Sequence, residues 1–292
     1  MSEDNIVWCP HPWPQTLALT KSDFEVLYWG ARWGWKTDAW LARLVRDTEN
    51  PQYRALVIRK NSEDLTDRVD RARDKYTPLG AVITGKPAII VFPSWATIRT
   101  WHLKDDNAYT KYQGHEYHRM VIEELTQIPN EENYMKLISS CRSTVKWLKA
   151  RIFCTTNPGG IWHNRVKRRF VDVALPWVSY TDPISGRSRV FIPAKVEDNP
   201  TLMERDPEYV KYLDSLPEDL KKAWRDWSWD VFDTKWSQYA RYINEAREAK
   251  RICAVEYEQV LDTYSFWDIG NDWVVIGIFQ FYGKEIRIVD CI

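Results

Sequence analysis

One stretch near the amino terminus constrains the fold more than any other, because it joins a strand, a loop and a helix in that order. Phe24–Tyr28 is an apolar run typical of a buried strand, and residues 37–47 follow a helical pattern. The loop between them reads Gly30-Ala31-Arg32-Trp33-Gly34-Trp35-Lys36-Thr37. This is the context of a phosphate-binding loop with the pattern GxxxxGK[ST]. We therefore expect an α/β domain built on a sheet.

The chemistry of such a loop depends on residue type at each place. Backbone N–H groups at a helix N-terminus hold phosphates, the lysine reaches the β- and γ-phosphate oxygens, and the threonine binds Mg²⁺. Gly30, Lys36 and Thr37 fit this pattern, whereas Trp35 stands where the last glycine belongs. The position of that glycine often requires a positive φ, which costs a residue with a Cβ, such as tryptophan, about 1–2 kcal/mol. The alternative is an ordinary strand–turn–helix whose lysine is solvated.

A second short strand ends in two acidic residues. Met120–Glu123 is an apolar run that closes on Glu123, and Glu124 follows it. The first carboxylate could hold Mg²⁺ or its water ligand, and the second could polarise an attacking water. Two glutamates at a strand end are otherwise the start of a solvated loop. Their place downstream of the phosphate loop favours the functional interpretation.

The remaining pattern divides the chain into three parts. In the first, 1–204, strands are expected at 55–59, 88–92, 97–102 and 151–155, and helices at 62–76, after Pro129 and at 163–173. Charged helices are expected at 205–226 and 237–250, consistent with a helical subdomain or linker over 205–258. A new β pattern begins in the third part, 259–292. The predicted class is α/β, with a small helical subdomain and the first strands of a second sheet.

Composition excludes several classes of protein. The chain has 292 residues, 44% of them hydrophobic and 28% charged, which suits a large buried core and argues against disorder. No apolar run approaches the roughly 18 residues of a membrane span, and the acidic start is unlike a signal peptide. Five scattered cysteines without CxxC spacing favour a reduced, intracellular protein without zinc. With 41 basic and 41 acidic residues, any DNA contact must be a local patch.

Further motifs occur in a fixed order. They are Pro14-Gln15, Thr155-Thr156-Asn157-Pro158-Gly159-Gly160, Phe191-Ile192-Pro193-Ala194, Asp198-Asn199-Pro200 and Ser228-Trp229-Asp230-Val231-Phe232. With the phosphate loop and the acidic strand, they make the chain resemble the large terminase subunit of tailed bacteriophages, an ATP-driven DNA-packaging motor. The resemblance runs from about residue 12 to the end. It implies that 1–204 is a P-loop ATPase core; a P-loop ATPase of the helicase type is an alternative.

The resemblance also implies roles for individual residues. The nucleotide would be bound by Gln15, Gly30, Ala31, Arg32, Trp33, Gly34, Trp35, Lys36 and Thr37. Gln15 would read the adenine edge, and Thr37 and Glu123 would hold magnesium, so that ATP and Mg²⁺ are the expected cofactors. Glu124 would be the catalytic glutamate, and Asn157 would sense the γ-phosphate and pass hydrolysis to the helical subdomain. Arg32 in cis or Arg142 in trans would stabilise charge in the transition state.

Partners follow from the same resemblance. Double-stranded DNA would be translocated into a procapsid by a ring of identical subunits, together with a portal protein and a small terminase subunit. The expected place is the host cytoplasm, with transient binding at the portal vertex and no membrane association. The basic stretch Arg165–Arg169 could contact DNA phosphates, or could equally be a solvated helix face. The competing function is an inert assembly or DNA-binding relative whose loop is blocked by Trp35.

A second site would begin near the carboxyl end. Phe266-Trp267-Asp268-Ile269-Gly270 resembles the first strand of the terminase nuclease, which has a ribonuclease-H-like fold. Such sites use several carboxylates to hold two Mg²⁺ or Mn²⁺ ions about 3.5–4 Å apart. Asp268 would be the first ligand, and Asp290 is a weaker candidate at a strand end. One aspartate cannot build this site, so we expect an incomplete nuclease domain at 259–292 and no nuclease activity from this sequence.

Tryptophan is abnormally frequent and glycine is rare. There are 17 Trp and 11 Gly, whereas average usage predicts roughly 20 Gly. Eight tryptophans stand where local chemistry or the family pattern favours glycine: Trp29, Trp33, Trp35, Trp95, Trp101, Trp147, Trp162 and Trp227. We hypothesise that the gene uses UGA for glycine and that these codons were read as tryptophan. The rival hypothesis is genuine substitution, which UGG codons at these positions would support.

Overall fold

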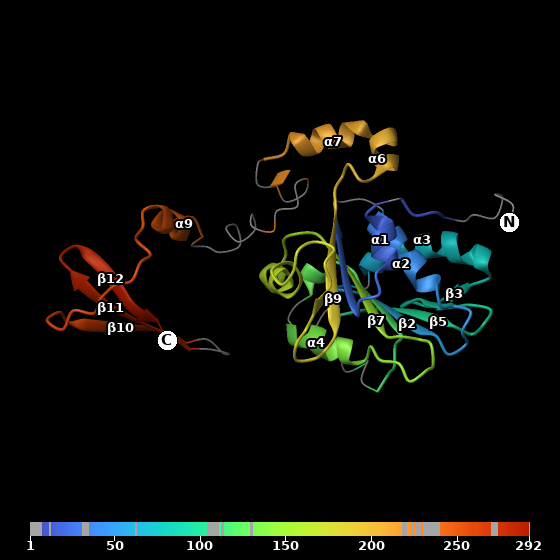
Figure 1. Ribbon diagram of the computed structural model, residues 1–292, viewed down its shortest axis with the longest axis horizontal. Helices are drawn as coiled ribbons and strands as arrows, with labels where there is room; N and C mark the ends of the chain where they lie inside the picture. Colours follow the sequence, from blue (N-terminus) through green and yellow to red (C-terminus); the bar gives the residue numbers. More distant parts are fainter. Residues whose placement is uncertain are drawn as a thin grey trace. The chain divides into compact units, whose positions relative to one another are not determined.

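The computed structural model describes residues 8–11, 13–30, 35–61, 63–103, 111, 114–128, 131–217, 221–222, 225, 229, 240–269 and 274–291. The chain divides into two compact units, Met1–Lys235 and Trp236–Ile292, which we describe separately (Figure 1). The sequence instead predicts three parts, 1–204, 205–258 and 259–292. That finer division stays a prediction.

The first unit is built on a nine-stranded sheet in the order β3-β4-β5-β2-β6-β7-β1-β9-β8. Its strands are β1 (Glu25–Gly30), β2 (Arg54–Arg59), β3 (Val82–Thr84), β4 (Ile89–Val91), β5 (Thr97–His102), β6 (Arg119–Ile122), β7 (Arg151–Thr156), β8 (Tyr180–Thr181) and β9 (Ser188–Ala194). The six strands from β5 to β9 in this order pair in parallel, and β3, β4 and β8 are antiparallel additions at the edges. The expected α/β class is confirmed.

Helices cover both faces of this sheet, because alternate strand residues point to opposite sides. Val26 and Tyr28 of β1 belong to one core cluster, and Leu27 and Trp29 belong to another. The first cluster is completed by α1 (Gln15–Thr20), α2 (Trp35–Val45) and α3 (Thr66–Tyr76), and the second by α4 (Glu131–Ser139), α5 (His163–Val166) and the π-helix η6 (Lys167–Val171). The unit is therefore a three-layer α/β/α arrangement (Figure 1).

Short helices complete the first unit. They are η2 (Glu63–Leu65), η3 (Thr77–Leu79), η5 (Leu125–Gln127), α6 (Pro200–Arg205) and α7 (Pro207–Asp214). Asn199 caps α6 by accepting a hydrogen bond from the Leu202 amide at 3.1 Å, and Asp206 caps α7 in the same way through Tyr209 at 3.2 Å. The prolines that follow these caps fit the first helical position, where no N–H is needed. The charged helix expected from residue 205 begins at Pro207 as α7 and ends at Asp214.

The second unit contains α9 (Ala240–Glu248) and an antiparallel sheet of β10 (Thr263–Ile269), β11 (Val274–Tyr282) and β12 (Glu285–Cys291). Its strands expose large apolar side chains, among them Phe266, Trp267, Ile269, Ile286 and Ile288. Across the described residues, no helix is both long and apolar enough to cross a membrane.

Candidate nucleotide site

Five of the predicted site residues lie together at the carboxyl ends of adjacent parallel strands: Lys36, Thr37, Glu123, Glu124 and Asn157. A cavity of about 350 Å³ opens there. It is lined by Lys36, Thr37, Arg59, Asp67, Arg68, Arg71, Glu123, Glu124, Gln127, Thr155 and Asn157. Ligands of open α/β sheets bind at this edge, because loops and helix N-termini gather there.

Lys36 lies at the start of α2 and is buried. Its Nζ donates hydrogen bonds to the carbonyl oxygens of Gly30 at 2.9 Å and Thr156 at 3.2 Å, and to Oδ1 of Asn157 at 2.5 Å. Gly30 has no room for a side chain, since a Cβ there would lie 2.8 Å from the Ala194 carbonyl oxygen of β9. The lysine is therefore held between the end of β1 and the end of β7.

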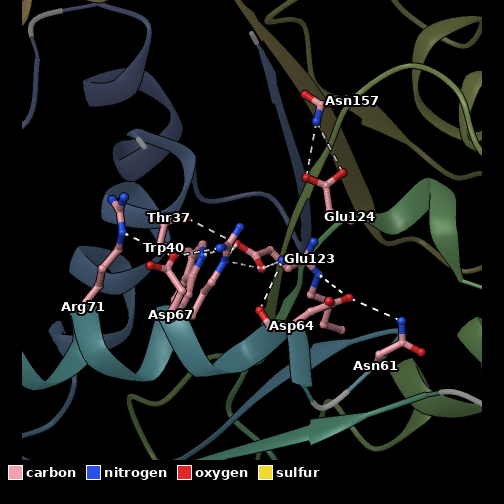
Figure 2. Close-up of polar contacts among 11 residues, drawn as sticks. Thr37, Trp40, Asn61, Asp64, Asp67, Arg71, Glu123, Glu124 and Asn157 are labelled. Carbon is pink, nitrogen blue, oxygen red and sulfur yellow. Dashed lines mark hydrogen bonds and ion pairs between the residues drawn. The ribbon is translucent and has the colours of Figure 1, made fainter. Parts of the chain in front are cut away.

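Glu123 carries a buried carboxylate surrounded by donors. Oε1 accepts from the Thr37 hydroxyl at 3.3 Å and from the Trp40 indole at 3.4 Å. Two guanidinium groups complete its shell: Arg59 Nη1 lies 3.1 Å from Oε2, and Arg68 Nε lies 3.2 and 3.1 Å from the two oxygens. Figure 2 shows this carboxylate pointing toward Thr37, Trp40 and helix α3.

The pKa of Arg68 reflects the same contacts. Burial alone would lower the pKa of this guanidinium, but Glu123 and Asp67 outweigh the burial and raise it above its ordinary value. Arg68 therefore stays a cation inside the cavity.

Glu124 points away from its neighbour, toward the end of β7 (Figure 2). Its carboxylate accepts from the Asn157 amide nitrogen at 3.3 and 3.5 Å. The backbone of Glu124 is left-handed, with φ 53° and ψ 55°. A non-glycine residue in this region costs roughly 1–3 kcal/mol, and such strain persists where the surrounding structure imposes it. Lys36, Asn157 and Glu124 thus form one continuous polar chain.

The surroundings fix this chain in place. The hydroxyls of Thr126 and Thr156 lie 2.9 Å apart, and the Thr126 hydroxyl also donates to the Asn157 carbonyl oxygen at 3.1 Å. Gly160, at φ +95°, passes so close to η5 that a Cβ would lie 2.7 Å from the Thr126 carbonyl oxygen. The turn after β7 and the turn after β6 are consequently bound to each other.

Other predicted residues lie elsewhere. Gln15 is buried in α1, where its Oε1 accepts from the His11 amide at 2.7 Å, and α1 packs against α2. Arg142 follows Cys141, which pairs with Tyr117 before β6 begins. Arg142 is exposed near the amino ends of the parallel strands, and it does not line this cavity. Ala31, Arg32, Trp33 and Gly34 lie outside the described residues.

The two aspartates of the second unit do not form one site. Asp268 pairs with Val275 on β11, whereas Asp290 pairs with Ile278. Because side chains alternate along a strand, this register puts the two carboxylates on opposite faces of the sheet. Within the described ranges, no three His, Cys, Asp or Glu side chains are grouped to hold a metal ion.

Four of the suspected tryptophans are informative in the structure. Trp95 and Trp147 both have φ 74°, in the region that favours glycine, and both are exposed. Trp29 and Trp162 are instead buried in the second core cluster. Trp101 lies in β5, the side chain of Trp35 is not described, and Trp33 and Trp227 lie outside the described residues.

The arginines that line the cavity were missed in the sequence: Arg59, Arg68 and Arg71. Arg59 ends β2, which is the neighbour of β6 in the sheet, and the other two lie on one side of α3. The sequence feature that could have indicated these arginines is an Arg-rich helix that follows a predicted strand. This feature points to the site only when the pairing of β2 with β6 is known.

Glu123 and Thr37 are the side chains of the cavity that could hold Mg²⁺. The buried Glu123 carboxylate and the Thr37 hydroxyl are neighbours and carry oxygen atoms of the kind that this cation prefers, although the carboxylate is paired with Arg59 and Arg68 in the structure. Mg²⁺ in such sites is held by one or two protein oxygens together with phosphates and water, so three carboxylates are not needed.

A parallel sheet with a lysine, a threonine, paired glutamates and an asparagine at one edge defines a protein of the P-loop ATPase class. The family model described as "Terminase large subunit, T4likevirus-type, N-terminal" matches residues 27–225, and the chain belongs to this family of DNA-packaging motor subunits. No curated protein matches the chain.

Solved structures show the same fold. The chain is similar to the large terminase of a thermophilic bacteriophage, with a TM-score of 0.58 and 15% identity, covering 97% of this chain and 68% of that one. The same terminase in complex with ADP gives a TM-score of 0.55 at 13% identity, covering 95% and 67%. The large terminase ATPase domain of Thermus phage P74-26 gives 0.52 at 13% identity, covering 75% and 93%.

Proposed function

We propose that this chain hydrolyses ATP in the cavity beside Lys36 and uses the hydrolysis to move double-stranded DNA into a procapsid. The observation that carries the proposal is the convergence of Lys36, Thr37, Glu123, Glu124 and Asn157 on one cavity at the carboxyl edge of the sheet. The family membership supports the same function.

Each side chain has a distinct task. Lys36 would turn from its carbonyl partners to the β- and γ-phosphate oxygens, and Thr37 and Glu123 would hold Mg²⁺, which neutralises phosphate charge when bound. Glu124 would accept the proton of the attacking water. In the structure the Glu124 carboxylate accepts a hydrogen bond from the amide nitrogen of Asn157. The Asn157 Oδ1 atom in turn accepts a hydrogen bond from Lys36. Movement of the lysine to phosphate would free Oδ1 of Asn157, so that the amide could turn and release Glu124.

The turn that carries Asn157 also contacts the segment after α7. The Gly159 amide donates to Nδ1 of His163 at 2.9 Å, so Nε2 carries the ring hydrogen and donates to the Trp229 carbonyl oxygen at 2.7 Å. The rings of His163 and Trp229 also stack, with centroids 4.7 Å apart. We infer that hydrolysis sensed at Asn157 is passed through this contact to the helical segment.

Assembly and partners complete the proposal. Arg142 is exposed near the amino ends of the strands, away from the cavity, which supports a role as an arginine finger on a neighbouring subunit of a ring. Arg32 would instead act on the nucleotide of its own subunit. A portal protein and a small terminase subunit are the expected partners. A nuclease activity is supported only by the resemblance around Asp268, and Asp290 does not share its face of the sheet.

The first prediction concerns Glu124. Replacing its carboxylate by an amide removes the proton acceptor, so Glu124→Gln should lower kcat by about 10²–10⁴-fold while nucleotide affinity is retained. Phosphate release with duplex DNA present measures this. Glu132→Gln, at an exposed Glu–Lys pair of α4, is the matched control and should keep full activity.

The experiment should be run on two forms of the phosphate loop. One is the sequence as printed, and the other carries Trp29→Gly, Trp33→Gly and Trp35→Gly. Hydrolysis by the glycine form alone would support misread codons. Absence of hydrolysis in both forms would contradict the proposed function and favour the inert relative.

A further inference from the structure

The cavity holds a cation pair that the proposed ATPase chemistry does not yet use. Arg59 and Arg68 both contact Glu123, the carboxylate assigned to Mg²⁺. Glu123 is only 3% exposed, and Arg68 contacts both of its oxygens. Mg²⁺ binds carboxylate oxygens at about 2.1 Å and carries positive charge, so it would compete with these guanidinium groups for the Glu123 oxygens. Binding of the metal would therefore favour departure of one arginine.

Arg68 is the one placed to leave. Its side chain is 25% exposed, against 14% for Arg59, and it faces the cavity from helix α3. Arg59 ends a central strand and is also paired with Asp64 at 3.4 Å. A second contact, from Arg68 Nη1 to Asp67 at 2.8 Å, keeps the guanidinium at the rim of the cavity when Glu123 is taken by metal.

We propose that Arg68 is a sensor of the nucleotide state, which pairs with Glu123 in the absence of Mg–nucleotide and moves to the γ-phosphate when Mg²⁺ takes Glu123. The inference rests on the proposed function of the cavity. A planar guanidinium binds phosphate oxygens in the same bidentate manner as carboxylate oxygens, so the exchange replaces one charged pair by another. Since ADP has no γ-phosphate, only ATP would provide the new partner.

Two consequences distinguish this role from a structural one. Arg68 would favour ATP over ADP, because its contact with phosphate exists only in the ATP complex. It would also compete with Mg²⁺ for Glu123. Arg68→Met, which keeps the apolar stem and removes the charge, should therefore lower the ratio of ATPγS to ADP affinity on the order of ten-fold. The same variant should bind Mg²⁺ more tightly in the presence of ADP.

The experiment is equilibrium binding of fluorescent ADP and ATPγS, with and without Mg²⁺, in whichever of the two phosphate-loop forms binds nucleotide. Arg73→Ala is the matched control: it lies on the same helix, pairs with Asp70 and does not line this cavity, so both affinities should be unchanged. Arg68→Lys, which keeps the charge, should restore part of the preference for ATPγS. Thermal unfolding checks that each variant is folded, and Arg68→Gln replaces the Met variant if that one is not.

The outcomes are separable. Nucleotide binding with an unchanged ATPγS-to-ADP ratio in the folded neutral variant would overturn the role of Arg68 and leave the proposed function intact. Failure of both loop forms to bind any nucleotide would overturn the proposed function, and this inference with it.

Discussion

At the scale of single residues, a left-handed backbone marks two different situations. At Glu124 it turns the carboxylate away from Glu123 and toward Asn157, so the strained conformation separates the two acids into different tasks. At Trp95, Trp147 and Trp177 the φ values are 74°, 74° and 65°, and these three side chains are exposed. Trp177 was not among the eight tryptophans that the sequence singled out.

These tryptophans lead to a stability prediction. Trp95→Gly and Trp147→Gly should each raise the free energy of unfolding by about 1 kcal/mol, because glycine relieves the positive φ and the side chains are 74% and 86% exposed. Urea unfolding measures the change. Trp40→Gly, in the buried face of α2, is the control and should lower stability by about 4 kcal/mol. Loss of stability at positions 95 and 147, or UGG codons there, would contradict the glycine hypothesis.

At the scale of elements, the basic stretch after β7 illustrates a charged pattern that proves structural in part. Arg169 of η6 donates to both oxygens of Glu25 in β1, at 3.0 and 2.7 Å, and this carboxylate also accepts from Tyr134 at 2.5 Å. Arg169→Ala should therefore lower the free energy of unfolding by about 3–5 kcal/mol, since it leaves a buried charge unpaired. Arg165→Ala removes only a half-exposed pair with Glu131 and should cost less than about 1 kcal/mol. Urea unfolding of the two variants measures both losses, and equal losses would contradict this account.

Which elements the sequence predicts follows from how local their signal is. Apolar runs and helical periodicity located β1, α2, β2, α3, β6, α4 and β7 to within a few residues. β9 was expected only as a motif, because Pro193 interrupts its strand pattern, although it lies beside β1 in the sheet. The short edge strands β3 and β8 were not predicted, since their pairing supplies what their sequence lacks.

The same limit applies to the site. Lys36, Glu123, Glu124 and Asn157 follow strands and carry recognisable patterns, so the sequence pointed to them. The arginines of β2 and α3 became visible only through the order of strands in the sheet. Pairing of β2 with β6 is a long-range contact that no local pattern encodes.

At the scale of the whole molecule, the central claim is that hydrolysis at this cavity moves the chain along duplex DNA. Such movement requires contacts to the phosphate backbone, which are tolerant of sequence and weakened by salt. A helicase-type ATPase with the same phosphate loop would instead separate the strands. The two activities are therefore distinguishable on one substrate.

The measurement that tests this claim most directly is displacement of a third strand from a DNA triplex. The account predicts ATP-dependent release of the third strand while the underlying duplex stays paired, and loss of that release in Glu124→Gln. Separation of the duplex strands, or ATP hydrolysis without any release of the third strand, would contradict it.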